Sequence, residues 1–147
     1  MKVPTLRALS PTDGRYAEKV NDLRDIFSEY GLIRFRVMVE VRWLQCLADA
    51  PDIEEVGPIS SVMKDVLNRI VDDFALDDAE RVKNIEATTN HDVKAVEYFI
   101  RERLGDGPET QPLKDFLHFG CTSEDINNLS YACLLYTSDA ADDSVYV

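Results

Sequence analysis

Apolar residues recur at steps of three and four positions along several stretches of the chain, which is the period of an amphipathic helix. The first stretch runs from about residue 30 to 47, and Pro51 is expected to end it because proline cannot continue a helix. Stretches from about 58 to 74 and from about 93 to 104 show the same period, and Gly105 is placed to end the second of these. No segment has the alternation of a strand. We therefore predict an all-α fold.

Shorter signals mark the starts of helices. Asp77 is a suitable N-cap for a short helix around residues 79–85, and Pro58 suits the first turn of the helix over 58–74. Thr122 and Asp125 stand three residues apart, as in a capping box with aspartate in the usual place of glutamate, so a helix is expected to begin there. The helix over 58–74 should bury the stripe Ile59, Val62, Val66, Ile70 and Phe74.

Size and charge narrow the classes of partner. The chain has 147 residues, the size of one domain, with 28 acidic and 16 basic side chains and a formal net charge of -12. This charge disfavours nucleic acid and an anionic membrane surface as partners. A small anionic ligand is compatible with it, provided that positive groups gather where the ligand binds.

Several features point to a cytoplasmic protein. The residues after Met1 do not form a hydrophobic signal core, and no apolar run reaches the length of a membrane span. Cys46, Cys121 and Cys133 are an odd number without metal-binding spacing, so free thiols in a reducing compartment are expected. No motif for a metal or a nucleotide cofactor occurs, and we expect neither.

Three short polar segments are candidates for contact with an anion. Arg15 and Tyr16 follow a turn, and arginine offers a planar fork of donors for phosphate or carboxylate, although such an arginine is more often a solvated surface charge. Asn90, His91 and Asp92 precede a predicted helix, whose N-terminus favours an anion. The alternative is that Asn90 or Asp92 is only the N-cap of that helix.

The third segment begins at Gly120 and contains the adjacent hydroxyls of Thr122 and Ser123. These hydroxyls could cap the helix or bind ligand oxygens. Asn127 and Asn128 follow about one turn later, where amides are poor helix formers if nothing uses them. Capping explains one of the hydroxyls but not the whole polar cluster.

Two further side chains have chemical potential. His118 precedes Phe119 in a half-buried apolar element, and we interpret it as a structural histidine, hydrogen-bonded in or near the core. Cys121 has no basic partner fixed near it by the sequence, so we do not expect a nucleophile there. The residues thus offer candidates for binding rather than a complete catalytic set.

Taken together, these segments resemble the adenylosuccinate lyase family, most closely its bacterial members. The resemblance rests on SPTDGRY at 10–16, TTNHDVKAVEY at 88–98 and TSEDINN at 122–128, and it extends over residues 5 to about 132. Three long segments in the right order make it specific. The family belongs to the fumarase and aspartase superfamily, whose members are mostly helical homotetramers built around a long helix bundle.

The resemblance implies a reaction and a site. The reaction would be cleavage by β-elimination of adenylosuccinate to AMP and fumarate, and of the succinylated carboxamide ribotide of purine synthesis. No metal or organic cofactor is implied. The implied partners are a small-molecule substrate and, for the full-length form, further copies of the chain in a homotetramer. The implied substrate-binding residues are Arg15, Tyr16, Asn90, His91, Asp92, Thr122 and Ser123.

The resemblance also sets the expected domain limits. In this family the proton-transferring histidine and serine lie in later segments, so no catalytic residue is expected in this chain, and it should be inactive alone. We expect residues 1–133 to form the N-terminal helical domain, including the start of a bundle helix from about 122. Residues 134–147 do not resemble the family's continuation but a translated sequencing adapter, and we expect a disordered or artefactual tail.

Two alternatives remain open at this point. Another lyase of the superfamily, argininosuccinate lyase or fumarase, would share part of the segment 122–127, whereas DGRY at 13–16 and TNHD at 89–92 favour the adenylosuccinate enzymes. A non-catalytic helical interaction module would instead use the apolar stripes over 30–47 and 59–74 to dock a partner helix.

Overall fold

Helices make up the regular structure of the chain. The computed structural model describes the backbone of residues 5–142 and the side chains of residues 6–138. No strand occurs within residues 5–142, so the all-α prediction is confirmed. The elements are η1 (Thr5–Arg7), η2 (Asn21–Leu23), α1 (Arg24–Phe27), α2 (Glu29–Asp49), α3 (Ser61–Asp72), α4 (Leu76–Thr89), α5 (Asp92–Leu104), α6 (Thr110–Asp115) and α7 (Ser123–Asp142).

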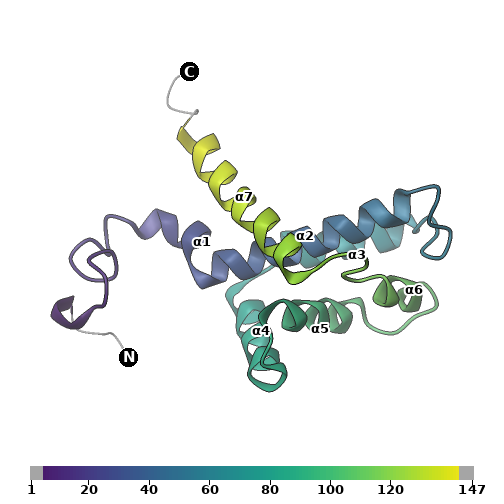
Figure 1. Ribbon diagram of the computed structural model, residues 1–147, viewed down its shortest axis with the longest axis horizontal. Coiled ribbons are helices and arrows are strands. Elements are labelled where there is room, and N and C mark those ends of the chain that lie inside the picture. Colours follow the sequence, from purple (N-terminus) through teal and green to yellow (C-terminus); the bar gives the residue numbers. More distant parts are fainter. Residues whose placement is uncertain (1–4, 143–147) are drawn as a thin grey trace.

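Helix α2 is the centre of the arrangement. It contacts α1, α3, α4, α5 and α7, and Figure 1 shows it running lengthwise through the molecule. In this view α4 and α5 lie below α2, while α7 rises above it and projects away. The segment that precedes α1 extends away from these helices at the left. The arrangement therefore offers α2 as the element that α5 and α7 share.

The helix predicted over residues 30–47 is confirmed as α2. Ser28 Oγ caps its start by accepting the N–H of Gly31 at 3.2 Å. The helix ends at Asp49, before Pro51, as was predicted from the position of the proline. Its core side chains Ile33, Val37, Val41 and Leu44 are at most 3% exposed.

Gly31 permits a very close approach between α1 and α2. A Cβ atom at this position would lie 2.1 Å from the backbone oxygen of Ile26, which cannot move aside as a flexible side chain would. We expect Gly31→Ala to lower the free energy of unfolding by about 1–3 kcal/mol, as overpacking does.

Gly107→Ala is the matched control for this substitution, because its added Cβ would make only an ordinary contact with Thr110 at 3.7 Å. Urea unfolding of the two variants, followed by circular dichroism, measures the difference. Equal stabilities of the two variants would contradict the close approach at Gly31.

Helix α3 begins later than predicted, and one residue of its predicted buried stripe is exposed. Ser60 is its N-cap, so Pro58 lies outside the helix. Val62, predicted to be buried, is 68% exposed, whereas Leu67 is fully buried. The prediction for Val62 was wrong because it lies five positions, about 140° around a helix, from Leu67. The stripe that packs on the core is Met63, Val66, Leu67, Ile70 and Val71.

The predicted break near residues 88–92 separates α4 from α5. Asn90 ends α4 in the left-handed conformation, with φ 51°. His91 caps α5, because its Nδ1 accepts the N–H of Lys94 at 3.2 Å. The N-cap of α5 is therefore neither Asn90 nor Asp92. Gly105 ends α5, as predicted.

Helix α4 is longer than the short helix expected around residues 79–85, and it starts with a different cap. Asp77 was predicted as the cap, but the N–H of Ala75 donates to Asp78 Oδ2 at 2.9 Å. Asp78 thus satisfies a backbone group at the start of α4, and Asp77 lies in its first turn. The N-cap of α4 is Ala75, two positions before Asp77, so the prediction for Asp77 was wrong.

Helix α7 begins where the capping box predicted. The N–H and the hydroxyl of Thr122 both donate to Asp125 Oδ2, at 2.7 and 2.9 Å. The helix continues past residue 133 to Asp142, and Leu134 is buried. The predicted domain boundary therefore does not coincide with the end of a helix. That boundary and the origin of residues 134–147 stay predictions, and residues 143–147 lie outside the described part of the chain.

Candidate functional site

Arg36, a residue of α2, joins two of the three predicted segments. Its Nε donates to Oδ1 of Asn127, in the second turn of α7, at 2.9 Å. Its Nη2 lies 2.7 Å from Oδ2 of Asp92, the first residue of α5. The structure therefore brings the segment at residues 90–92 together with the segment at residues 122–128.

Two contacts favour the ionised form of the Asp92 side chain. Burial acts to raise the pKa of Asp92, but the hydrogen bond from the Val93 N–H and the charge of Arg36 outweigh it, and the pKa lies below the ordinary value. The N-terminus of α5 favours a negative charge at this position as well. The charge of Asp92 is thus compensated locally, although its side chain is 45% exposed.

His91 stands beside Asp92 with half of its side chain exposed. Its Nδ1 accepts the N–H of Lys94, so the neutral ring carries its proton on Nε2. Capping fixes the ring and leaves that second nitrogen as a donor. The same residue can therefore cap the helix and donate a hydrogen bond to an anion, so the two interpretations of this segment do not exclude each other.

The hydroxyl of Thr122 has a defined role in its own segment. Because it donates to Asp125, its lone pairs are the groups left for a ligand. The hydrogen bonds from the backbone N–H and hydroxyl of Thr122 lower the pKa of Asp125 below its ordinary value. Thr122 is exposed and Ser123 is half-buried at the start of α7. Backbone N–H groups at that helix start remain the natural donors to an anion.

The first predicted segment lies apart from the other two. Arg15 and Tyr16 are exposed, and the guanidinium of Arg15 lies over the Tyr16 ring, 5.3 Å from its centroid. In Figure 1 the chain before α1 extends away from the starts of α5 and α7. The structure therefore does not bring Arg15 and Tyr16 to the residues around Arg36.

A buried acid and a histidine lie on the same side of α2 as Arg36. Glu40 is fully buried, and its Oε1 is 2.6 Å from Nδ1 of His118. Its other oxygen, Oε2, has no hydrogen-bond partner among the described residues. Burial raises the pKa of Glu40, while the His118 ring acts to lower it and Glu97 acts to raise it. The interpretation of His118 as a hydrogen-bonded structural histidine agrees with this contact.

Sequence reasoning missed Arg36 and the contact made by Glu40. A signal for both was present, because Ile33, Arg36, Val37, Glu40, Val41 and Leu44 follow the three-and-four spacing of one helix face. Charged residues at core-facing positions require partners. The partners, Asp92, Asn127 and His118, are far away in the sequence and could not be identified from it.

The cysteines fit the expectation of free thiols. Cys46, Cys121 and Cys133 make no disulfide. Burial raises the pKa of the Cys121 thiol, and Glu40 and Asp125 raise it further. A thiol that ionises less readily is a poor nucleophile. The structure thus supports the view that Cys121 has no nucleophilic role.

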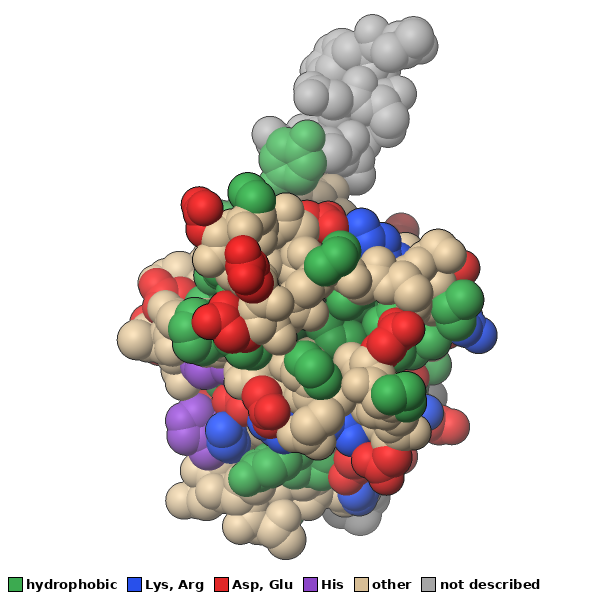
Figure 2. Space-filling view, turned by 90° about the vertical axis from the view of Figure 1, so that its right-hand side faces the viewer, with side chains coloured by type: hydrophobic (Ala, Val, Ile, Leu, Met, Phe, Trp, Pro, Cys, Tyr) green, Lys and Arg blue, Asp and Glu red, His purple; other side chains and the backbone are tan. Residues whose placement is uncertain are grey.

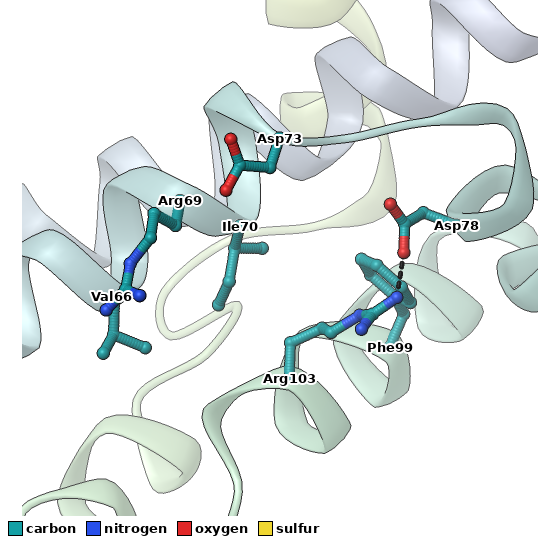
Figure 3. A pocket seen from close by; sticks show the side chains of 7 residues that line it. All are labelled: Val66, Arg69, Ile70, Asp73, Asp78, Phe99 and Arg103. Atoms are coloured by element: carbon teal, nitrogen blue, oxygen red, sulfur yellow. Dashed lines mark hydrogen bonds and ion pairs between the residues drawn. The ribbon is translucent and has the colours of Figure 1, made fainter.

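A pocket of about 380 Å³ lies elsewhere, between α3 and the helices α4 and α5. Figure 3 shows Arg103 of α5 reaching toward Asp78, with which it forms an ion pair, and lying over the Phe99 ring. Arg69 of α3 and Asp73, the residue directly after α3, line the facing wall. None of the predicted substrate-binding residues lines this pocket, so the predicted site is a separate surface.

The outer face of the molecule carries mixed charge. Figure 2 shows Asp and Glu side chains spread over this face, with hydrophobic side chains exposed among them and histidine side chains at its left edge, near Lys or Arg.

No helix within the described residues is long and apolar enough to cross a membrane. The described side chains also include no group of three or more His, Cys, Asp or Glu residues that could hold a metal ion.

Comparison with known proteins defines the class of this chain. A family model described as lyase matches residues 14–142. The chain belongs to this lyase family.

The curated relatives are more specific. The adenylosuccinate lyase of Haemophilus influenzae is 57% identical over 138 residues, which cover 94% of this chain and 30% of that protein. The adenylosuccinate lyase of Escherichia coli K12 is 55% identical over the same shares. That of Vibrio cholerae is 51% identical over 92% of this chain and 30% of its own length. The chain thus spans about 30% of the length of these relatives.

Proposed function

We propose that this chain is the substrate-contacting part of an adenylosuccinate lyase, which cleaves adenylosuccinate to AMP and fumarate and acts likewise on the succinylated carboxamide ribotide. The observation that carries the proposal is the 57% identity to an adenylosuccinate lyase over 94% of the chain. The three similar relatives named above share that name, which favours this reading over argininosuccinate lyase, fumarase or an interaction module.

The proposed substrate contacts follow from the chemistry of the ligand. Adenylosuccinate carries a phosphate and two carboxylates, and an acidic chain can bind it only where donors gather. His91 Nε2 at the start of α5 and backbone amides at the start of α7 provide such donors, and Arg36 links these two helix starts. The residues proposed to bind substrate are Arg15, Tyr16, Asn90, His91, Asp92, Thr122 and Ser123.

The elimination itself needs further groups. A base must take a carbon-bound proton and an acid must protonate the departing nitrogen as the carbon–nitrogen bond breaks to leave fumarate. We assign neither role to a residue of this chain and propose that the 147 residues are inactive alone. We also propose that the whole enzyme is a cytoplasmic homotetramer that works without a metal or an organic cofactor.

The proposal is tested by a chimera in which residues 1–132 of this chain replace the matching part of the Haemophilus influenzae relative. We expect the purified chimera to release fumarate from adenylosuccinate, as followed by ultraviolet absorbance. The 147-residue chain alone is expected to release none. The unaltered relative, prepared in the same way, is the control.

Each result has a distinct meaning. A folded chimera without fumarate release, beside an active control, would overturn the proposed function. Fumarate release by the 147-residue chain alone would overturn only the proposal that this chain lacks the proton-transferring groups. Activity of the chimera on argininosuccinate or malate in place of adenylosuccinate would favour the other superfamily lyases.

A further inference from the structure

The starts of α5 and α7 are joined to α2 by a small apolar cluster. Val39 of α2, Val93 of α5 and Ile126 of α7 are buried against one another, separate from the main core. Each belongs to a different helix, so their contact fixes the three helices at one point. None of these three side chains belongs to the main hydrophobic core.

Polar side chains lie beside this apolar cluster, and two of them belong to residues next to the apolar ones in the sequence. Asp92 precedes Val93, and Asn127 follows Ile126. Arg36, one helical turn before Val39, donates to both of them, at 2.7 Å to Asp92 and 2.9 Å to Asn127. Only 8% of Arg36 is exposed. The joint therefore combines an apolar cluster with two polar contacts of Arg36, one to α5 and one to α7.

We infer that Arg36 is a positioning residue that sets the spacing between the two substrate-binding segments at the starts of α5 and α7. The inference rests on the proposed function, since it concerns the geometry of that same site. Arg36 acts through Asp92 and Asn127. It thereby links the N-terminus of α5 to the N-terminus of α7.

The two partners of Arg36 are each fixed by a second contact on their own helix. Asp92 Oδ1 accepts the N–H of Val93 at 2.8 Å. Asn127 Nδ2 donates to Glu124 Oε1 at 3.0 Å. Each partner is therefore anchored within its helix, and the rigid, planar guanidinium determines how far apart the two helix starts lie.

Charge gives Arg36 a second effect on the same site. Asp92 is ionised and half-exposed at the place where an anionic ligand would approach. An unpaired carboxylate there would repel that ligand. The guanidinium of Arg36 lies on the buried side of Asp92 and offsets its charge, within a chain whose formal net charge is -12.

Two substitutions separate these effects. Arg36→Met keeps a long unbranched side chain but removes the donors and the charge. Arg36→Lys keeps the charge and loses the planar fork that serves two acceptors. The matched controls are Arg42→Met and Arg42→Lys, because Arg42 is also on α2 and bridges two side-chain amides, Gln45 at 2.8 Å and Asn68 at 2.6 Å, but is exposed.

The test is steady-state kinetics of the active chimera described above. We expect kcat/KM to fall on the order of 10- to 100-fold in Arg36→Met, mainly through a higher KM, because a small misplacement of binding groups is costly. Arg36→Lys should fall less. Both Arg42 variants should stay within about twofold, as for surface positions. A merely structural loss would lower the active fraction, and so kcat, with KM unchanged.

Hydrogen exchange gives a second measurement that does not depend on activity. In the chimera, Arg36→Met is expected to speed amide exchange at the starts of α5 and α7 and to leave the middle of α2 unchanged. If the unsubstituted chimera were inactive, the proposed function would fail, and exchange would still test the joint. Unchanged KM in an active Arg36→Met chimera, or unchanged exchange at both helix starts, would overturn the inference.

Discussion

Replacing Phe99 with alanine is expected to lower the free energy of unfolding of this chain by about 3–5 kcal/mol. Phe99 is 1% exposed in the main core. Its ring packs edge-on against Phe74, with centroids 5.7 Å apart and planes at 84°, and the guanidinium of Arg103 lies over it at 5.2 Å. Alanine would leave a cavity and remove both contacts.

This loss would exceed the effect at any half-exposed phenylalanine. Phe27→Ala is the matched control, because Phe27 is 49% exposed. Urea unfolding can be followed by the fluorescence of Trp43, the single tryptophan, whose Nε1 donates to the backbone oxygen of Phe119. A loss in Phe99→Ala no greater than that in Phe27→Ala would contradict the placement of Phe99 in the core.

The second large effect is expected from His118→Ala. This change leaves the fully buried Glu40 without its only side-chain partner in the described structure. Removing one member of a buried pair typically costs about 3–5 kcal/mol. We expect a loss of this size near pH 8 and a smaller loss near pH 5, because Glu40 can then take up a proton.

The direction of the pH dependence follows from the burial of Glu40. Burial raises the pKa of Glu40 above its ordinary value, so over a range of pH the folded chain holds a proton that the unfolded chain has lost. Stability therefore falls as pH rises from the ordinary pKa to the raised one. His118 acts to lower that pKa, and its removal extends the range upward.

The double variant Glu40→Gln/His118→Ala is the control for this prediction. It contains the same alanine at a position with φ 62°, so the backbone effect cancels, but it has no carboxyl group at position 40. Its stability should change less between pH 5 and pH 8 than that of His118→Ala. Equal pH dependence of the two variants, measured by urea unfolding, would contradict the role of Glu40.

The three- and four-residue spacing of the hydrophobic side chains predicted most of the helices. The predicted helices over 30–47 and 93–104 are present as α2 and α5, because each has a long stripe and a strong stop signal at Pro51 or Gly105. The errors were local. Val62 was assigned to the buried stripe of α3, and Asp77 was predicted as the N-cap of α4, which is Ala75. A start signal of one or two residues leaves such shifts undetermined.

The candidate site was only partly accessible to sequence reasoning. Polar segments at helix starts could be identified because capping residues and anion-binding residues are of the same types. That His91 caps α5 while its second ring nitrogen stays available depends on side-chain geometry. The contacts of Arg36 and Glu40 depend on residues 56 or more positions away, as the bonds to Asp92, Asn127 and His118 show.

The sequence by itself determined that this protein is helical, which faces of its main helices are buried, and which family it resembles, because these depend on local period and on contiguous motifs. Only the tertiary structure decided which polar segments meet. Packing on α2 brings the starts of α5 and α7 to Arg36 and leaves Arg15 and Tyr16 apart. A buried charge takes its partner from whichever helix folding places beside it, and no local pattern specifies that helix.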